Sequence, residues 1–370
     1  MNSMSPNVQE TFWERMGLQE EDRNTCVSAI EKTYPGADIE SYANQGYCSF
    51  TFLVTSSPKE LAQGVSTDHS TRTSAPCIVQ IRPPQHWLDR SITSAAQKTY
   101  GSLTPRVRDL QCSLPGALMA VEMDLKRGVA LSQLLLRRDL IDTHTKAKQV
   151  RLVESLASFT AQAWPNCTTE TRRRCMRADS PLSDGPSWLA RCTGKVGANM
   201  IPKLVKLIRD LPDPLLRERA RDTLDSLMSI VDYPVVVNHG DLIPTNILVD
   251  KETWEITGIV DWAEAEWLPF GMSLYGLDHC LGFLEHSSST PVFRYHEGAN
   301  DLKKTFWRKL VEVKPGVKER LESVRAIRDV GVFLWLGYAW DDGKIDRVVN
   351  EVDDAEDLAR LRSFLDIRNQ

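Results

Sequence analysis

The sequence is organised around the stretch Val235–Trp262, which reads VVVNHGDLIPTNILVDKETWEITGIVDW. Its apolar runs predict three short buried strands, at Val235–Val237, Ile247–Val249 and Ile256–Val260. Polar side chains stand at the ends of these strands: Asp241, Asn246 and Asp261. Two carboxylates and an amide gathered on one rim could hold Mg²⁺ against a polyphosphate and leave one carboxylate to orient a nucleophile.

The spacing of these side chains is informative in itself. His239, Asp241 and Asn246 follow the order His-x-Asp-x-x-x-x-Asn of phosphotransferase catalytic loops, and Asp261 ends a strand where a metal-binding Asp is expected. The alternative is a hairpin in which the Asp and the Asn only cap turns. The His, the strands and the downstream Asp together favour the catalytic interpretation.

Composition limits the class of protein. The chain has 370 residues, of which 42% are hydrophobic and 26% are charged, so it is long enough for two lobes around large cores. The net charge of −5 provides no basic field for nucleic acid or for an anionic membrane. We found no apolar run of membrane-spanning length and no charged-then-apolar leader, and we expect a cytoplasmic protein. The eight scattered cysteines form no Cys-x-x-Cys pair and are expected to be reduced thiols.

The segments His239–Leu242, Asn246–Val249 and Ile259–Trp262 together resemble the aminoglycoside phosphotransferase and choline kinase family. The run Trp267–Gly271 resembles fungal members of that family, which favours a role in secondary metabolism over antibiotic resistance. The resemblance implies an α+β, protein-kinase-like fold with two lobes. The small antiparallel-sheet lobe would cover residues 1–124, and the larger, mostly helical lobe residues 125–370.

The resemblance also implies that ATP and Mg²⁺ are the cofactors. A glycine at a strand-to-strand turn lets main-chain N–H groups approach phosphate oxygens, which assigns phosphate contacts to Gly46, Tyr47 and Ser49. The alternative is a simple turn that binds no ligand. A phosphate-binding Lys belongs on the strand Cys77–Arg82 in related kinases.

Arg82 takes the place of that Lys when Val79–Arg82 is aligned with the pattern Val-Ala-Ile-Lys, and Gln80 points to the same face. Arg keeps the positive charge, and its forked donors match phosphate. The alternative is that Arg82 sits on an edge strand and faces water. The predicted helix that follows, His86–Thr99, contains no Glu to pair with the cation.

The position of Glu122 and Met123 at the end of a predicted strand matches the hinge of related kinases. Their main-chain N–H and C=O groups would then pair with the edge of the nucleotide base. ATP and GTP both remain open as the donor.

The resemblance assigns a role to each side chain of the central stretch. Asn246 and Asp261 would bind Mg²⁺, and Asp241 would accept the proton of the acceptor hydroxyl as the catalytic base. His239 would be a structural brace, hydrogen-bonded to the main chain near Asp261.

The acceptor is expected to be the hydroxyl of a small molecule whose identity the sequence leaves open. Three carboxylates favour an amine-bearing acceptor: Glu264, Glu266 and Asp278. The alternative is that they are ordinary loop charges. The cationic run Arg172–Arg174 is read as solvated surface, with an anionic acceptor site as the alternative. No feature indicates an oligomeric state.

Three other functions compete with a small-molecule kinase. A nucleotide-binding pseudokinase is supported by the altered glycine loop and by the Arg or Gln in place of Lys, and opposed by the intact Asp241, Asn246 and Asp261. An enzyme of this fold with non-phosphoryl chemistry is the second alternative. A protein kinase in the strict sense is the third, and Trp262 and the missing Ala-Pro-Glu signature argue against it.

Overall fold

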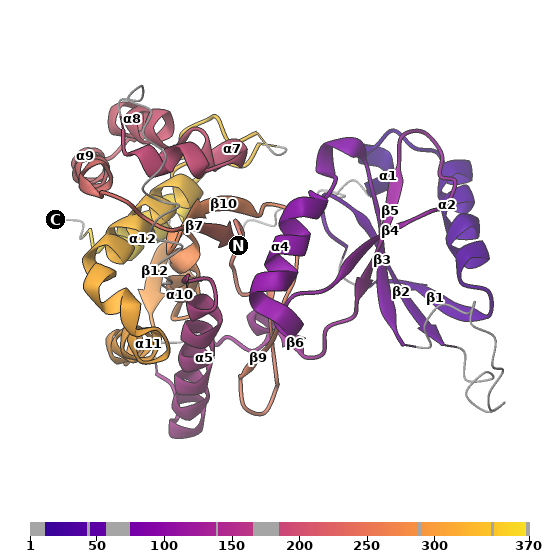
Figure 1. Ribbon diagram of the computed structural model, residues 1–370, viewed down its shortest axis with the longest axis horizontal. Coiled ribbons are helices and arrows are strands. Elements are labelled where there is room, and N and C mark those ends of the chain that lie inside the picture. The colour runs from indigo at the N-terminus through magenta and orange to yellow at the C-terminus, as the bar shows by residue number, and fades with distance from the viewer. Residues whose placement is uncertain are drawn as a thin grey trace. The chain divides into compact units, whose positions relative to one another are not determined.

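The computed structural model describes residues 12–42, 45–56, 75–137, 140–165, 185–286, 290–341 and 344–367. The contacts divide the chain into two compact units (Figure 1). Unit 1 comprises residues 1–94 and 105–126, and unit 2 comprises residues 95–104 and 127–370. The sequence-based boundary lay after residue 124. The helix α4 (Arg90–Tyr100) begins in unit 1 and ends in unit 2.

Unit 1 is built on a five-stranded antiparallel sheet in the order β1-β2-β3-β5-β4. Its strands are β1 (Ala37–Ser41), β2 (Phe50–Ser56), β3 (Cys77–Arg82), β4 (Val107–Leu110) and β5 (Met119–Asp124). Because side chains alternate along a strand, Val79 and Ile81 point to one face of β3 and Gln80 to the other.

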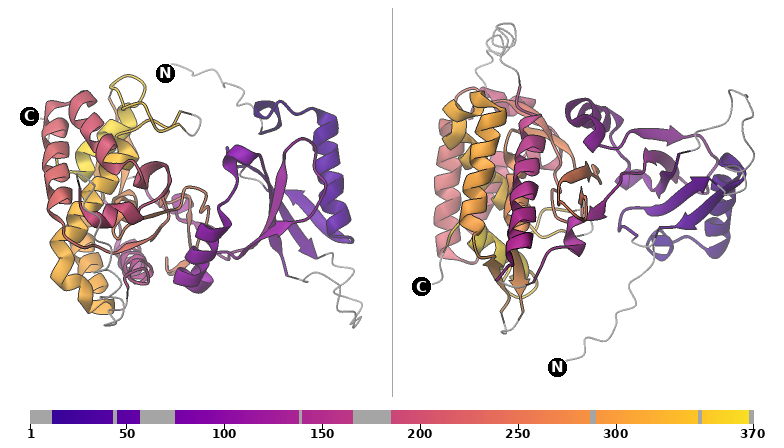
Figure 2. Two further views of the ribbon diagram at one scale, coloured as in Figure 1. Left: turned by 45° about the horizontal axis from the view of Figure 1, so that its top comes forward. Right: turned by 90° about the horizontal axis from the view of Figure 1, so that it is seen from below.

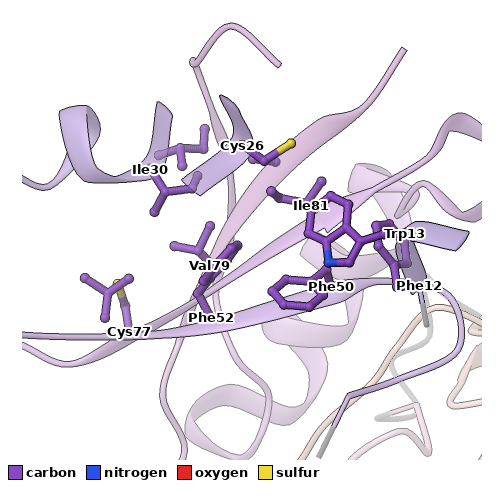
Figure 3. Close-up of a cluster of buried hydrophobic side chains, with 12 residues drawn as sticks. Phe12, Trp13, Cys26, Ile30, Phe50, Phe52, Cys77, Val79 and Ile81 are labelled. Atoms are coloured by element: carbon purple, nitrogen blue, oxygen red, sulfur yellow. The ribbon is translucent and has the colours of Figure 1, made fainter. Parts of the chain in front are cut away.

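Two helices cover the Val79–Ile81 face: α1 (Phe12–Arg15) and α2 (Glu20–Thr33). Figure 3 shows Cys26 and Ile30 of α2 beside the strand side chains, and Trp13 against Phe50, with ring centroids 4.7 Å apart. A reciprocal capping box between Gln19 and Asp22 fixes the start of α2. Each fully buried aliphatic side chain in this core contributes about 1.5–3 kcal/mol.

Unit 2 is mostly helical (Figure 2). Its helices are α5 (Thr143–Ala161), α7 (Gly194–Gly197), α8 (Met200–Asp210), α9 (Pro214–Ser229), α10 (Tyr275–His279), α11 (Ala299–Val313), α12 (Leu321–Leu336) and α13 (Ala355–Phe364). Its 3-10 turns include η3 (Leu131–Gln133) and η5 (Met272–Leu274). The helices α5 and α11 pack side by side, as do α8 and α9.

Three small sheets interrupt the helices of unit 2: β6-β8-β9, β7-β10 and β11-β12. Their strands are β6 (Val129–Ala130), β7 (Val235–Asn238), β8 (Ile247–Val249), β9 (Ile256–Ile259), β10 (Glu266–Pro269), β11 (Gly282–Glu285) and β12 (Val292–Tyr295). All pair antiparallel. The predicted α+β fold class, with a small antiparallel-sheet part and a larger helical part, is confirmed.

Apolar residues recur at helical spacing in Leu131–Arg138 and in Met272–Leu284 and predict helices there, which is wrong in whole or in part. In the described part of Leu131–Arg138 the turn η3 takes the place of a helix, and the Ser132 N–H donates to the Pro244 carbonyl, 3.1 Å away. Met272–Leu284 forms η5 and α10 followed by strand β11, which pairs with β12. Contacts with other segments are not revealed by local apolar spacing.

No helix in the described part of the chain combines the length and the apolar character that a membrane crossing requires.

Candidate active site

The polar side chains of the central stretch lie at one end of a β-hairpin in unit 2. Strand β8 pairs antiparallel with β9, with Ile247 opposite Ile259. Asn246 directly precedes β8 and Asp261 follows β9, so the pairing brings both to the same end of the hairpin. The Val260 N–H donates to the Asn246 carbonyl over 3.0 Å and holds the two segments together.

The Asp241 carboxyl is fixed by the Asn246 side chain. Asn246 Nδ2 donates to Asp241 Oδ2 over 2.8 Å and to the Asp241 carbonyl over 2.9 Å. Burial and then the negative charge of Asp261 raise the pKa of Asp241 to about 7, against the opposing effect of the Asn246 hydrogen bond. Asp241 Oδ1 is buried and has no hydrogen-bond partner among the described residues. A base that receives a hydroxyl proton requires such an oxygen.

His239 lies under the loop as a neutral, fixed ring. Its Nδ1 accepts the Asp241 N–H over 3.2 Å, and its Nε2 lies 2.8 Å from the Val260 carbonyl. The ring therefore carries its proton on Nε2, and burial lowers the pKa of His239 to about 4. His239 thus joins the residue that precedes Asp261 to the main chain of Asp241.

The main chain at this site adopts two left-handed conformations. Gly240 has φ +75°, and a Cβ there would lie 1.8 Å from the Glu264 carbonyl oxygen. Only glycine permits both this conformation and this close approach. Asp261 has φ +59°, which is uncommon for a residue with a side chain and is concentrated at functional sites.

A column of aromatic rings supports the loop. Trp262 packs on His239, with ring centroids 4.7 Å apart, and on Tyr100, 5.3 Å apart. Tyr100 stacks on Phe159 at 4.4 Å, and its hydroxyl donates to the Val237 carbonyl over 2.9 Å. Tyr100 ends α4, which explains why residues 95–104 group with unit 2. Sequence reasoning used Trp262 only as evidence against a protein kinase in the strict sense, and it missed Tyr100.

Tyr275 of α10 contacts the main chain on both sides of Asp241. Its hydroxyl donates to the Gly240 carbonyl over 2.9 Å and accepts the Leu242 N–H over 3.4 Å. The ring stacks on Trp335 with centroids 5.1 Å apart. The sequence offered no signal for this contact, because Tyr275 lies 34 positions beyond Asp241 in a segment read as an ordinary helix.

The donor set suits Mg²⁺ rather than a transition metal. Because Asn246 Nδ2 is bonded to Asp241, the amide oxygen is the atom of that side chain that could coordinate a hard cation. Asp261 is exposed at the surface of unit 2. In the described residues no group of three or more His, Cys, Asp or Glu side chains could hold a metal ion. One amide and one carboxylate would leave the other positions to phosphate and water, as is usual for Mg²⁺.

In unit 1, the structure joins two of the expected phosphate-contacting residues, Arg82 and Gln80, by hydrogen bonds. Arg82 lies on the central strand β3 and is buried, so the alternative of an edge-strand Arg facing water is wrong. Its Nε and Nη2 donate to Gln80 Oε1 over 3.0 and 2.8 Å, and its Nη1 donates to the His86 carbonyl over 3.1 Å. The rings of His86 and Tyr47 make an edge contact, with centroids 6.4 Å apart. Tyr47 lies beside Gly46 and the buried Ser49.

The expectation for Glu122 and Met123 is corrected by the sheet. Both residues lie inside β5, which pairs with β3 on one side and with β4 on the other. Their main-chain groups therefore belong to the ladders, not to a base edge. The Glu122 carboxylate accepts the Tyr34 hydroxyl over 2.6 Å, on the side of α2. Leu125 is the first residue beyond the strand.

Two of the three carboxylates expected near the acceptor have structural partners. The Glu266 carboxylate accepts the main-chain N–H groups of Lys195, Val196 and Gly197 over 2.6–3.2 Å, and so caps α7. Asp278 is 2% exposed and pairs with Lys303, 2.8 Å away, and with Arg328. Neither carboxylate attracts a cationic acceptor in this geometry, which corrects that expectation.

Glu264 remains a candidate contact to the acceptor, because its main chain contacts Gly240 and its charge acts on Asp241. The run Arg172–Arg174 lies outside the described residues.

Comparison with known proteins gives a family and a set of partial relatives. A family model described as "Phosphotransferase enzyme family" matches residues 59–275, more than half of the chain. An aminoglycoside 3'-phosphotransferase of Streptomyces fradiae is 33% identical over 115 residues, which cover 27% of this chain and 41% of that protein. One of Streptomyces ribosidificus is 40% identical over 75 residues, 19% of this chain and 27% of that protein. The chain thus matches less than half the length of either relative.

Among solved structures, a thermostable mutant of aminoglycoside phosphotransferase APH(4)-Ia, in ternary complex with ADP and hygromycin B, is similar at 14% identity. The similarity covers 92% of this chain and 98% of that chain, with a TM-score of 0.48.

Proposed function

Because the chain belongs to the phosphotransferase enzyme family, we propose that it transfers the γ-phosphoryl group of ATP to a hydroxyl of a small molecule. The observation that carries this proposal is the fixed Asp241 carboxyl, with one oxygen bonded to Asn246 and the other without a described partner, beside the negative charge of Asp261. Phosphoryl transfer needs positioned groups and charge neutralisation more than covalent chemistry by the protein.

Asp241 is the proposed catalytic base. Its Oδ1 accepts a hydrogen bond from the acceptor hydroxyl and takes the proton as the new phosphorus–oxygen bond forms. His239 and Tyr275 keep the main chain of Asp241 in place, and the neutral His239 leaves the role of base to the carboxylate.

Asn246 and Asp261 are the proposed ligands of Mg²⁺. When bound, the cation neutralises negative charge on the polyphosphate. The left-handed conformation of Asp261 and the Val260–Asn246 hydrogen bond orient these side chains before any ligand arrives. Such preorganisation saves the cost of ordering the side chains during the reaction.

In unit 1, Arg82 is the proposed phosphate-binding cation, and the main chain at Gly46, Tyr47 and Ser49 is the proposed phosphate cover. Gln80 holds the guanidinium in one orientation from the same face of β3. Arg retains a positive charge at any physiological pH, as the absent Lys would.

Two observations favour a second function, that of a nucleotide-binding pseudokinase. The Arg82 guanidinium is already bonded to Gln80 and to the His86 carbonyl. The helix α4 also carries no acidic residue to replace the Glu of kinases. Binding of MgATP without turnover would identify this second function.

The test combines binding with turnover. A thermal-shift titration with MgATP measures nucleotide binding, and a coupled assay measures ADP release with a panel of alcohols. The proposal expects a shift with MgATP and acceptor-dependent ADP release that depends on Asp241. ADP release equal to the buffer rate with every alcohol, despite MgATP binding, would favour the pseudokinase.

A further inference from the structure

A hollow of about 510 Å³ opens on unit 2, between α7–α8 and the segment that follows α12. Four lysines and one carboxylate supply the charges of its lining: Lys195, Lys203, Lys206, Lys344 and Asp346. We call it the lysine hollow. Its volume falls in the range of small-molecule sites, roughly 300–1,000 Å³.

The charge of the lysine hollow is opposite to that of the whole chain. The chain carries a net charge of −5. Lys206 pairs with Asp210, 3.0 Å away, outside the lining. Lys203 and Lys344 outnumber the single lining carboxylate of Asp346, so the hollow is cationic. Lysine ammonium groups are strong donors to carboxylate and phosphate.

Lys203 is held in place by its surroundings. Its Nζ lies 4.3 Å from the centre of the Tyr338 ring and donates to the Ile345 carbonyl. The Tyr338 hydroxyl in turn donates to the Lys203 carbonyl over 2.8 Å. An ammonium group carries three donors, and the Ile345 carbonyl takes one of them. A side chain fixed in advance loses little entropy when it binds a ligand.

Hydrogen bonds join the wall of the lysine hollow to the strands beside the proposed catalytic loop, residues 239–246. The Lys195 N–H donates to Glu266 Oε1 over 2.6 Å, and the Thr193 N–H donates to the Trp267 carbonyl over 3.0 Å. Glu266 pairs with Asn238 between β10 and β7, and Asn238 stands three residues before Asp241. Figure 1 shows α7 beside β10. The wall of the hollow is therefore bonded to β10, and β10 pairs with β7, the strand that leads into the proposed catalytic loop.

We propose that the acceptor carries a carboxylate or phosphate group, bound by Lys203 and Lys344 in the lysine hollow, while its hydroxyl reaches Asp241. This inference rests on the proposed function and names its substrate class. The acceptor oxygen forms the new bond to the γ-phosphorus, the bond from that phosphorus to the bridging oxygen of ADP breaks, and the hydroxyl proton passes to Asp241.

The structure of the acidic residues supports this substrate class. Glu266, which would have attracted an amine, is capped by three main-chain N–H groups of the hollow's own wall. Asp278 is neutralised by Lys303 and Arg328. Two of the three carboxylates that would have favoured an amine are thus already bound by groups of the protein itself.

The experiment compares four hexoses of similar size: glucose, glucosamine, glucuronate and glucose 6-phosphate. Their affinities for the full-length protein are measured by calorimetry without nucleotide. The proposal expects at least one of the two anions to bind about tenfold or more tightly than glucose, the effect of one charge-assisted hydrogen bond. The two anions distinguish a carboxylate from a phosphate. Equal affinities for all four, or a preference for glucosamine, would overturn the proposal.

Variants locate the effect. Lys344→Gln and the double variant Lys203→Gln/Lys344→Gln are expected to lose most of the preference for the anion. The single variant is made at the exposed Lys344 because Lys203 packs on Tyr338, and replacing Lys203 could disturb folding. Lys304→Gln on α11 is the matched control, with the same loss of charge at an exposed site that pairs with Asp301. An unchanged preference in both hollow variants, or an equal loss in the control, would contradict the assignment.

The proposed function is tested separately in the same preparations. Anion binding without MgATP-dependent turnover of any alcohol would support the anion site in the lysine hollow and contradict the proposed kinase activity. Turnover of an amino alcohol in preference to the anions would support the kinase activity and overturn the anionic acceptor.

Discussion

The proposed catalytic loop of unit 2, residues 239–246, and the Arg82 segment of unit 1 hold their charged side chains by different means. Asp241 is fixed by short-range contacts, from Asn246 five residues away and from the His239 ring two residues away. Arg82 is fixed by Gln80, two residues before it on β3, and by the His86 carbonyl, and Gln80 in turn donates to Thr51 of the neighbouring strand β2 over 3.2 Å. The first arrangement is encoded by spacing in one hairpin, and the second also draws on a neighbouring strand of the sheet.

This difference predicts where substitutions will act. Changes in the catalytic loop should alter turnover with nucleotide affinity preserved, because the loop is organised within unit 2. Changes at Arg82 should alter nucleotide affinity first.

The largest effect is expected for Asp241→Asn. Loss of the base should lower kcat by at least about 10²-fold, with MgATP binding retained in a thermal-shift titration. Asp301→Asn removes an exposed carboxylate on α11 and should leave kcat unchanged. Turnover by Asp241→Asn within a few-fold of the wild type would exclude Asp241 from the mechanism.

Gly240→Ala should follow in size. The added Cβ would lie 1.8 Å from the Glu264 carbonyl oxygen, at φ +75°. Gly298→Ala is the control, since Gly298 has φ +84° but no atom lies within 4 Å of the added Cβ. We expect Gly240→Ala to lose about 1–3 kcal/mol more free energy of unfolding than the control, together with kcat. Equal losses would show that the contact with Glu264 is not needed.

Arg82→Gln tests the other side of the comparison. The KM for ATP should rise about tenfold, with a smaller change in kcat, because a charge-assisted contact to phosphate is lost. Arg108→Gln, in which a half-exposed Arg of β4 is replaced, should leave this KM unchanged. If Arg82→Gln lowered kcat alone, Arg82 would belong with the catalytic groups.

Tyr275→Phe should have a smaller effect, specific to the loop. It removes the hydroxyl that bonds the Gly240 carbonyl and the Leu242 N–H. Tyr233→Phe removes a buried hydroxyl bonded to the Phe270 carbonyl over 3.0 Å. Both should cost about 1 kcal/mol of stability, but only Tyr275→Phe should lower kcat, by a few-fold, at unchanged KM for ATP. A kcat equal in the two variants would assign Tyr275 a purely structural role.

The last effect concerns the pH dependence of stability without metal or nucleotide, and it involves no change in turnover. The pKa of Asp241 is raised to about 7 in the folded protein. Between about pH 4 and 7 the folded state therefore binds more protons at this carboxyl than the unfolded state, so this residue lowers stability as pH rises. In EDTA, Asp241→Asn should gain on the order of 2–3 kcal/mol relative to the wild type between pH 5 and pH 8. A constant difference would contradict the raised pKa.

The part of the site that lies in one hairpin was predictable from sequence. The spacing of Asp241, Asn246 and Asp261 follows from strand pairing over 21 residues, and it also indicated the fold class. Tyr275 and the cap that α7 places on Glu266 were not predictable. Each joins segments separated by tens of residues, and neither side chain stands in a pattern that differs from ordinary core or loop.

The residues proposed to bind nucleotide are an intermediate case. Period-two alternation placed Arg82 and Gln80 on one face of β3. The same alternation could not show that Glu122 and Met123 lie between two partner strands, because the order of strands in the sheet is a tertiary property. The lysine hollow was not predictable from the sequence for the same reason, because its lysines come from helices and from a loop about 140 residues apart in sequence.

Phosphorus NMR of the full-length protein with MgATP and the four hexoses tests the central claim most directly. The account predicts that a phosphomonoester resonance and ADP appear together for at least one hexose with the wild type, and that both are lost in Asp241→Asn. Intact ATP with every acceptor, or the same phosphomonoester formed at the same rate by Asp241→Asn, would contradict it.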